Sequence, residues 1–285
     1  MFLLADSGAT KTDWFLFDES GTQKRLRTSG INPMVQTEVQ IRTNALTDLS
    51  ELLSGVKIEK VFYYGAGLRT QGKVEILTKL LKELFPEAEM EVNHDLLGAA
   101  RATCGDEKGI TCILGTGSNS CWYDEGEIKM EIGGHGYVLG DEGSGADLGK
   151  TLVKKALDNE LPEHAKKDLE EYVGKPLLEL RNEIYQHPRP NYYFASLAKY
   201  IAERKENPLY HGLVLGRMTT FIGKTVIKYY GYSEMPVHFI GSIAQVFEKE
   251  LRMACDIFSL QMGRIVQAPA ETLVDYHLAR MKAHS

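Results

Sequence analysis

Short runs of apolar residues that end in small polar residues and glycine recur along this chain. Phe2–Ala5 is predicted to be a buried strand, and the polar segment Asp6–Asp13 separates it from a second apolar run, Trp14–Phe17. Two apolar strands joined by a polar, glycine-containing loop are typical of a β-hairpin, here with a loop longer than a two-residue turn. The chain therefore opens with a hairpin whose loop carries several reactive side chains.

The second half of the chain repeats this pattern in outline. The apolar run Ile110–Leu114 ends in Gly115–Ser118, and two further predicted strands follow at 119–123 and 127–132. The remaining periodic segments are predicted as helices at 37–54, 72–85, 95–103, within 146–231, at 243–254 and from 269, and as strands at 60–64, 90–93, 237–240 and 264–267. We therefore expect two related α/β lobes that pack against each other with a cleft between them. The first lobe should span residues 1–104 and be completed by the C-terminal helix 269–285, and the second should span 105–268.

Composition and charge exclude several classes of protein. The chain has 285 residues and a formal net charge of −6, and its lysines and arginines are scattered, so neither a nucleic-acid-binding surface nor a polybasic membrane-binding surface is indicated. Its apolar runs are too short for a transmembrane helix or a signal peptide. The four cysteines lack metal-binding spacing and are expected to be buried and structural. We expect a soluble, cytoplasmic enzyme, and no feature decides between a monomer and a homodimer.

The loop of the first hairpin has the composition of a phosphate-binding turn. Backbone N–H groups and hydroxyls gathered in a tight turn can bind phosphate oxygens, and Lys11 would add a positive charge. Asp6, at the end of the strand, can hold Mg²⁺, usually through water because this ion dehydrates reluctantly. The spacing matches neither the Walker A motif nor GxGxxG. Taken alone, the loop is equally well interpreted as a plain polar hairpin.

Three later segments have related chemistry. Gly115–Ser120 also joins two predicted strands, and Gly241-Ser242 ends a strand where small residues would let a flat ring approach the backbone. The segment Gly133–Gly145 is dense in glycine and carries the adjacent carboxylates Asp141 and Glu142, which can accept hydrogen bonds from the hydroxyls of a polyol. Ordering so many glycines costs conformational entropy. A functional loop is therefore favoured over a flexible surface loop.

Taken in chain order, these segments resemble the motifs of one protein family. The combination resembles the sugar kinase/Hsp70/actin superfamily, and within it the BadF/BadG/BcrA/BcrD ATPase-like group, which includes N-acetylglucosamine kinase. The segments that carry the resemblance are Asp6–Asp13 and Gly115–Ser120 as phosphate motifs, Gly30–Pro33 as a sugar-contacting segment, Asn93–Ala100 as the connecting motif, Gly133–Ser144, and Gly241-Ser242 as the adenosine motif. The GGxG…GDEGS stretch within Gly133–Ser144 is the most specific of them.

The resemblance implies a fold, cofactors and residue roles. The fold would be α/β, with two ribonuclease-H-like lobes of the actin/hexokinase type that close over ATP and a sugar. Asp6 would organise Mg²⁺ through water. The nucleotide would be bound by Ser7, Gly8, Thr10, Lys11, Thr12, Thr116, Gly117, Ser118, Gly241 and Ser242. The sugar would be bound by Asn32, Asp95, Gly134, His135 and Asp141, and Asp95 would also be the general base.

Alternatives remain open for the key residue and for the function. By itself, an Asp at position 95, between a strand and a helix, could be only an N-cap. The resemblance favours ATP-dependent phosphorylation of an amino sugar, with N-acetylglucosamine to its 6-phosphate as the first choice and glucosamine or N-acetylmuramic acid as close variants. An activator ATPase of a 2-hydroxyacyl-CoA dehydratase or benzoyl-CoA reductase system would need cluster-ligating cysteines. A sugar-responsive repressor would need a DNA-binding helix-turn-helix before the first strand.

Overall fold

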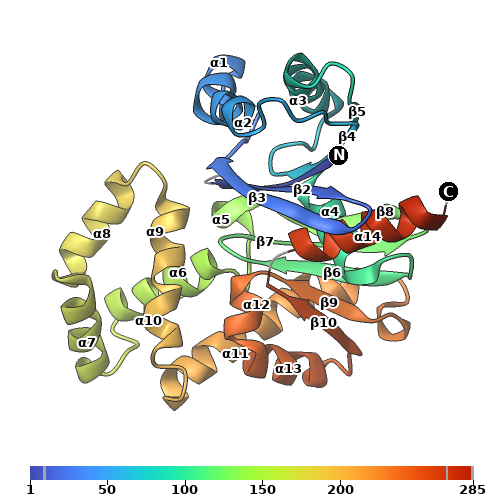
Figure 1. The fold of residues 1–285 in the computed structure, drawn as a ribbon. Helices are drawn as coiled ribbons and strands as arrows, with labels where there is room; N and C mark the ends of the chain where they lie inside the picture. Colours follow the sequence, from blue (N-terminus) through green and yellow to red (C-terminus); the bar gives the residue numbers. More distant parts are fainter. Residues whose placement is uncertain (9–10, 268, 284–285) are drawn as a thin grey trace. The chain divides into compact units, whose positions relative to one another are not determined.

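The chain divides into two compact units, each built on its own sheet (Figure 1). The computed structural model describes residues 1–8, 11–267 and 269–283. Unit 1 comprises residues 1–106 and 268–285, and unit 2 comprises residues 107–267. Across the sheet of unit 1 the strands lie in the order β3 (Gly21–Ser29), β2 (Lys11–Asp18), β1 (Phe2–Ser7), β4 (Lys60–Gly65) and β5 (Glu89–His94).

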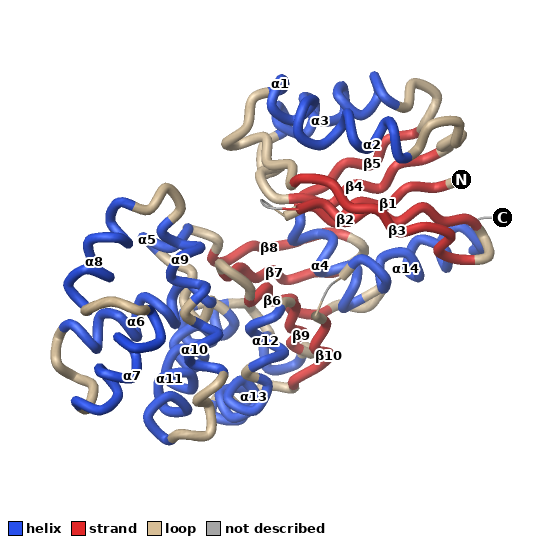
Figure 2. Tube along the Cα trace, turned by 60° about the vertical axis from the view of Figure 1, so that its left-hand side comes forward, coloured by secondary structure: helices blue, strands red, loops and turns tan. Residues whose placement is uncertain are grey.

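Helices cover both faces of the sheet in unit 1 (Figure 2). One face carries α1 (Glu38–Ile41), the π-helical turn η1 (Arg42–Leu46), α2 (Thr47–Leu52) and α3 (Gln71–Leu84), and the other carries α4 (Asp95–Cys104) and α14 (Ala270–Ala283). Successive strand residues point to opposite faces, so Tyr63 packs in the core beneath α1–α3 while Tyr64 faces α4 and α14. Strands covered on both faces are apolar almost throughout, which explains the unbroken apolar runs at 2–5 and 61–64.

Unit 2 contains a second five-stranded sheet and most of the helices. Its strands lie in the order β8 (Glu127–Gly133), β7 (Ser118–Asp124), β6 (Gly109–Leu114), β9 (Val237–Ile240) and β10 (Met262–Val266). Its helices are α5 (Gly136–Leu139), α6 (Gly145–Leu157), α7 (Glu163–Val173), α8 (Leu177–Gln186), α9 (Pro190–Ser196), α10 (Ala198–Ala202), α11 (Pro208–Lys224), α12 (Ser242–Val246) and α13 (Glu248–Ile257), with 3₁₀ turns η2 (Val226–Lys228) and η3 (Tyr232–Glu234). Side chains of β6 and β9, including Cys112 and Phe239, form one core with α6, α11 and α13.

The two sheets share one topology. In each unit the first three strands of the chain form an antiparallel meander, and the fourth and fifth strands lie parallel to the first on its other side. This strand order is the ribonuclease-H-like arrangement that the family resemblance implied for both lobes. The outline repeat of hairpin, helix and strand in the two halves of the sequence therefore corresponds to a repeat of structure.

The third strand of unit 1 differs from the sequence prediction. The hairpin was expected to end at 19–22, whereas β3 continues the meander from Gly21 to Ser29. Within β3 only Leu26 and Thr28 are buried, and charged residues occupy most other positions. Edge strands expose one side and often carry such charges, so the apolar alternation that identifies a strand is weak here. The predicted helix at 243–254 is likewise divided into α12 and α13 by Phe247.

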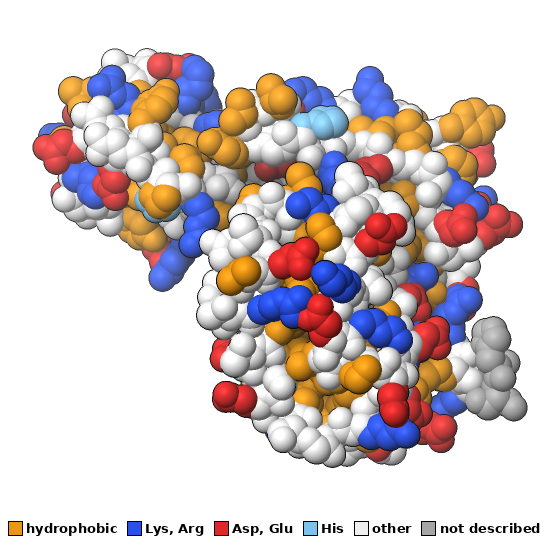
Figure 3. Space-filling model, turned by 90° about the horizontal axis from the view of Figure 1, so that it is seen from above, with side chains coloured by type: hydrophobic (Ala, Val, Ile, Leu, Met, Phe, Trp, Pro, Cys, Tyr) orange, Lys and Arg blue, Asp and Glu red, His pale blue; other side chains and the backbone are white. Residues whose placement is uncertain are grey.

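Three general expectations can be compared with the described residues. All four cysteines are buried and none is part of a disulfide, as predicted for structural thiols. On the face drawn in Figure 3, acidic and basic side chains are interspersed. Within residues 1–8, 11–267 and 269–283, every helix is too short or too polar to cross a bilayer.

Candidate functional site

Two carboxylates meet at one edge of the sheet in unit 1. The parallel strands β1, β4 and β5 end together, since Ser7 pairs with Gly65 and Gly65 with His94. Asp6 precedes the end of β1, and Asp95 directly follows β5. Burial and the negative charges of Asp13 and Asp95 raise the pKa of Asp6 to about 6. The carboxyl ends of parallel strands are the usual place for a ligand site in α/β folds. In unit 1 this edge of the sheet carries the carboxylates of Asp6 and Asp95.

The donor set at this edge suits Mg²⁺ better than a metal held by protein alone. Among the described residues there is no cluster of three or more His, Cys, Asp or Glu side chains placed to hold a metal. Mg²⁺ commonly takes one or two protein carboxylates and completes its shell with water and substrate phosphates. A partly buried carboxylate beside other negative charges is also stabilised by a cation. Asp6 therefore fits the predicted role.

Two of the three hydroxyls predicted to contact phosphate in the first loop, those of Ser7 and Thr12, point elsewhere. Ser7 Oγ lies 2.7 Å from Thr12 Oγ1 and accepts a hydrogen bond from Ile31 N at 3.3 Å. Thr12 Oγ1 also donates to Ser29 O at 3.3 Å. Both side chains are buried. They join the hairpin to residues 29–31. A side-chain contact to phosphate would require these hydroxyls to face outward, and they do not.

The rest of the first loop is exposed and partly charged. Gly8 is exposed, and its N–H donates to Lys11 O at 2.9 Å. Lys11 Nζ lies 2.8 Å from a carboxylate oxygen of Asp13. Burial works to raise the pKa of Asp13, but hydrogen bonds from Lys11 and Arg27 hold it below its ordinary value. The predicted contact Thr10 lies outside the described residues.

A corner beside Asp6 holds the predicted sugar-binding Asn32. Asn32 Oδ1 accepts a hydrogen bond from Met34 N at 3.0 Å, which orients the side-chain amide. Gly67, with φ +81°, lies against this amide so closely that a Cβ would overlap Asn32 Oδ1. Ala66 N donates to Ser7 O at 3.0 Å and joins this loop to β1. The sequence analysis overlooked Gly65-Ala66-Gly67, although small residues directly after a predicted strand were a readable signal.

Asp95 is the first residue of α4 and not its N-cap. The N-cap is His94, whose side chain makes no capping hydrogen bond. Asp95 is exposed, and its Oδ1 accepts a hydrogen bond from Leu96 N at 2.9 Å. The N-cap interpretation of Asp95 is therefore wrong in this structure. A carboxylate in the first turn still interacts favourably with the helix dipole, and it remains accessible to a substrate.

In unit 2, the second phosphate loop and the glycine-rich loop lie against each other. Gly145 N donates to Gly115 O at 2.8 Å, Gly134 N donates to Ser118 O at 3.2 Å, and Ser118 Oγ donates to Glu142 O at 2.8 Å. The tertiary structure therefore brings together five predicted residues from separate motifs: Thr116, Gly117, Ser118, Gly134 and Asp141. Ser118 is buried and its hydroxyl is engaged, so its side chain has a structural contact within the loop.

The carboxylate of Asp141 sits over Gly117 in this cluster. A Cβ at Gly117 would lie 2.8 Å from Asp141 Oδ2. Burial raises the pKa of Asp141, against the opposing effects of hydrogen bonding from the Ser118 backbone and of the Lys150 charge. His135 is exposed at the start of α5, and a Cβ at Gly140 would lie 3.2 Å from His135 Cβ. Asp141 thus packs against Gly117 of the second phosphate loop, and His135 packs against Gly140, the residue that precedes Asp141.

Gly241 packs directly on the end of β6. Its φ is +113°, and a Cβ there would overlap Leu114 O. Its N–H donates to Val266 O at 2.9 Å, which joins it to β10. Ser242 follows as the exposed first residue of α12. The predicted adenosine motif therefore adjoins the start of the second phosphate loop, and glycine is required at position 241 by close approach.

A buried ion pair that the sequence analysis did not identify anchors the glycine-rich loop. Asp147 is 4% exposed, and its Oδ2 accepts hydrogen bonds from Gly143 N at 2.9 Å and Arg217 Nε at 2.7 Å. Arg217 lies on α11, 70 positions later in the chain. Glu142 makes a second, more exposed contact to α11, through Lys224 Nζ at 2.5 Å. The loop is thereby fixed to a helix, which supports a structural role for Glu142.

Replacing Arg217 with Met is expected to lower the free energy of unfolding by about 3–5 kcal/mol, because it leaves the Asp147 carboxylate buried without its cation. Urea unfolding measures this loss. The matched control is Lys224→Met, which breaks the pair with Glu142 at a lysine that is 62% exposed and should cost no more than about 1 kcal/mol. Equal losses for the two variants would contradict the anchoring role of Arg217.

Comparison with known proteins now identifies the family. Residues 5–206 match the model of the BadF/BadG/BcrA/BcrD ATPase family. The chain belongs to this family. The resemblance inferred from the motifs is thus confirmed. A solved structure from Porphyromonas gingivalis, provisionally named an N-acetylglucosamine kinase, is 36% identical, with 99% of this chain and 100% of that one covered and a TM-score of 0.89. The fold of this family member is therefore that of the two-lobed sugar kinases.

Two curated relatives match over shorter regions. A glucosamine kinase of Vibrio cholerae is 27% identical over 135 residues, which are 46% of this chain and 45% of that protein. An N-acetylmuramic acid/N-acetylglucosamine kinase of Clostridium acetobutylicum is 33% identical over 89 residues, 31% of this chain and 29% of that protein. The chain thus matches less than half the length of these curated relatives, whose named substrates are all amino sugars.

Proposed function

We propose that this protein is an ATP-dependent kinase of an amino sugar, and that it converts N-acetylglucosamine to N-acetylglucosamine 6-phosphate. Membership of an ATPase family and similarity to proteins named as amino-sugar kinases support this proposal. The observation that carries it is the pair of carboxylates at the sheet edge of unit 1. Asp95 is exposed on a helix terminus, while Asp6 is partly buried with a raised pKa. Two carboxylates in such different surroundings suit two different roles.

Asp95 accepts the proton of the attacking hydroxyl in this mechanism. Phosphoryl transfer asks the protein mainly to position the reactants and to neutralise charge, and a placed base adds to this. Asp6 would hold Mg²⁺, and the bound ion would supply neutralisation of charge on the phosphates. The Asn32 amide, oriented by its contact to Met34, binds a sugar hydroxyl.

The remaining predicted residues take binding roles in their own units. Gly8, Thr10 and Lys11 in unit 1, with Thr116, Gly117, Gly241 and Ser242 in unit 2, bind the nucleotide. Ser7, Thr12 and Ser118 act by shaping the loops whose backbone amides face the phosphates, because their own hydroxyls are engaged within the protein. Gly134, His135 and Asp141 bind the sugar.

The cysteines argue against the alternative of an activator ATPase with an iron–sulfur cluster. Cluster ligation needs accessible thiolates gathered at one place. Cys104, Cys112, Cys121 and Cys255 are each buried in the packed interior of their unit, and burial raises the pKa of Cys255 to about 12. These thiols behave as small apolar side chains.

A coupled assay of ADP release across a panel of sugars tests the proposed function. With Mg²⁺ and ATP, N-acetylglucosamine should give a kcat/KM at least about tenfold above that for glucose, since a missing polar contact leaves site groups unpaired. Glucosamine and N-acetylmuramic acid belong in the same panel, and phosphorus NMR locates the phosphate on the product. ATP hydrolysis that no sugar accelerates would contradict the proposal.

A further inference from the structure

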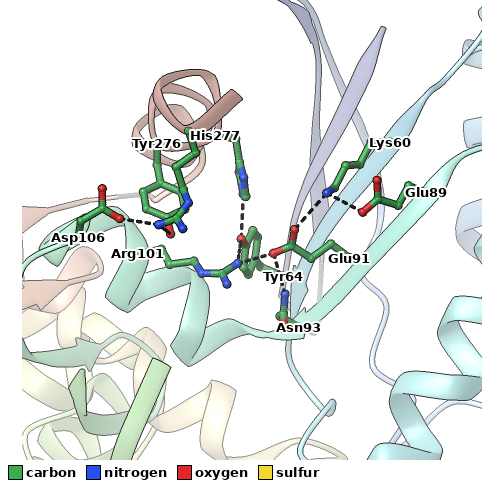
Figure 4. A network of polar contacts seen from close by, with 10 residues as sticks. Lys60, Tyr64, Glu89, Glu91, Asn93, Arg101, Asp106, Tyr276 and His277 are labelled. Atoms are coloured by element: carbon green, nitrogen blue, oxygen red, sulfur yellow. Dashed lines mark hydrogen bonds and ion pairs between the residues drawn. The ribbon is translucent and has the colours of Figure 1, made fainter. Parts of the chain in front are cut away.

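Tyr64 connects the two helices that cover one face of the sheet in unit 1 (Figure 4). It lies on β4, paired with Asp6 of β1, and its side chain is buried. Its hydroxyl accepts a hydrogen bond from Arg101 on α4 at 2.7 Å and lies 2.8 Å from His277 Nε2 on α14. Burial, with the charges of Arg101 and Lys60, lowers the pKa of His277 to about 3, so the ring is neutral and its contact with Tyr64 is a hydrogen bond between two uncharged groups.

The ring of Tyr64 also supports the backbone of α4. A Cβ at Gly98 would lie 2.9 Å from Tyr64 Cγ and Cδ1, so the helix rests directly on the ring. Asp95, Gly98 and Arg101 are spaced by three residues, so each is a surface neighbour of the next, along a row that turns by about 120° around the helix from Asp95 to Arg101. The ring of Tyr64 packs against Gly98, and its hydroxyl forms a hydrogen bond with Arg101. The first residue of the row is the candidate base.

Arg101 is held on its other side by the neighbouring strand. Arg101 Nη1 lies 2.5 Å from Glu91 Oε1 on β5, and Figure 4 shows the guanidinium in contact with both Glu91 and the Tyr64 hydroxyl. Arg101 is 17% exposed at its side chain and Glu91 is 29% exposed, so the pair is shielded from solvent more than a surface ion pair. These contacts determine where α4 lies on strands β4 and β5, whose ends form the candidate site.

We propose that Tyr64 is a positioning residue that fixes α4, and with it Asp95, relative to Asp6. This inference rests on the proposed function, because it assigns Tyr64 an effect on the reaction that Asp95 assists. Catalysis is sensitive to small displacements, and a shift of about 1 Å can lower a rate by about 10²-fold. Tyr64 touches no predicted substrate atom, so its effect should appear in kcat and not in KM.

The test compares Tyr64→Phe with Tyr276→Phe. Tyr64→Phe keeps the ring beneath Gly98 but removes the hydroxyl between α4 and α14, and kcat should fall about 5- to 50-fold with KM for ATP and sugar within about twofold. Tyr276→Phe removes a hydroxyl from the same network, one that accepts a hydrogen bond from Arg280 of its own helix at 3.1 Å, and kcat should stay within about twofold. Hydrogen exchange at residues 96–99 should accelerate in Tyr64→Phe only.

Gly98→Ala is the second variant. Alanine favours a helix more than glycine does, but its methyl group would displace α4 from the Tyr64 ring. A fall in kcat like that of Tyr64→Phe would therefore support positioning. Tyr64→Phe with more than half of the wild-type kcat, or with unchanged exchange at 96–99, would overturn the inference. If wild type phosphorylates no sugar, the proposed function fails, while the exchange comparison of the two Tyr→Phe variants still decides whether Tyr64 holds α4.

Discussion

Replacing Asp95 with Asn is expected to lower kcat by about 10²–10⁴-fold, because Asn keeps the size of the side chain but cannot accept the proton of the attacking hydroxyl. ATP affinity should change little, since Asp95 is not among the residues assigned to the nucleotide. Stability should change by no more than about 1 kcal/mol, the typical value of a carboxylate at a helix N-terminus. Steady-state kinetics, nucleotide titration and thermal unfolding measure the three quantities.

The control for Asp95→Asn removes a carboxylate from the start of β5, the strand whose other end is directly followed by Asp95. Glu89 begins β5, is exposed and pairs with Lys60 at 2.8 Å. Glu89→Gln should leave kcat within about twofold, because a pair at the surface contributes little and lies away from the sheet edge that carries Asp95. If Asp95→Asn retains more than about a tenth of the wild-type kcat, Asp95 is not the general base.

Replacing Asp6 with Asn is expected to reduce activity and to increase stability. The variant loses the carboxylate assigned to Mg²⁺, and kcat/KM for ATP should fall by about 10²–10³-fold, given that a metal ion supplies several kcal/mol of charge stabilisation. Its unfolding temperature at pH 7.5 without Mg²⁺ should exceed that of wild type, because the buried charge of Asp6 and its repulsion by Asp13 and Asp95 are removed.

The pH dependence of this gain follows from the direction of the pKa shift. The pKa of Asp6 in the folded protein is about 6, above its ordinary value of 3.8. Ionised Asp6 therefore destabilises the folded state, and this penalty grows as pH rises from about 4 to 6 and is constant above that range. The advantage of Asp6→Asn over wild type should be small at pH 4 and complete by pH 7. Thermal unfolding at several pH values checks it.

Asp13→Asn is the matched control, because the expected change in its unfolding temperature has the opposite sign to that of Asp6→Asn. Hydrogen bonds from Lys11 and Arg27 lower its pKa, so ionised Asp13 stabilises the folded state above its unfolded pKa, and this stabilisation is lost as pH falls through the folded pKa. Asp13→Asn should therefore lower the unfolding temperature at pH 7, by an amount limited by solvent screening of the exposed lysine and arginine.

Adding Mg²⁺ should raise the unfolding temperature of wild type and not that of Asp6→Asn. An equal effect of Mg²⁺ on both proteins would show that Asp6 does not hold the ion.

Local sequence pattern was sufficient to predict the loops, the family motifs and nine of the ten strands that the described residues form. A buried strand needs only a short apolar run, and a loop that approaches another backbone needs glycine, so both are visible in a few consecutive residues. For this reason the hairpin at 2–17, the segment Gly133–Ser144 and the strand ending at Gly241 could be identified from the sequence alone. The position of Asp95 at the end of a strand was predictable in the same way.

The tertiary structure decided which side chains stay accessible at the candidate site and which are used to hold its loops in place. Ser7 and Thr12 have phosphate-binding chemistry, but their hydroxyls are used to bind residues 29–31. The strand β3 escaped prediction because its charged residues lie on a sheet edge. The partners Asp147 and Arg217 are 70 positions apart, and Tyr64 and His277 are 213 apart. Hydrogen bonds of this kind depend on which distant segments the fold brings within about 3 Å, and no local pattern of residue types records that distance.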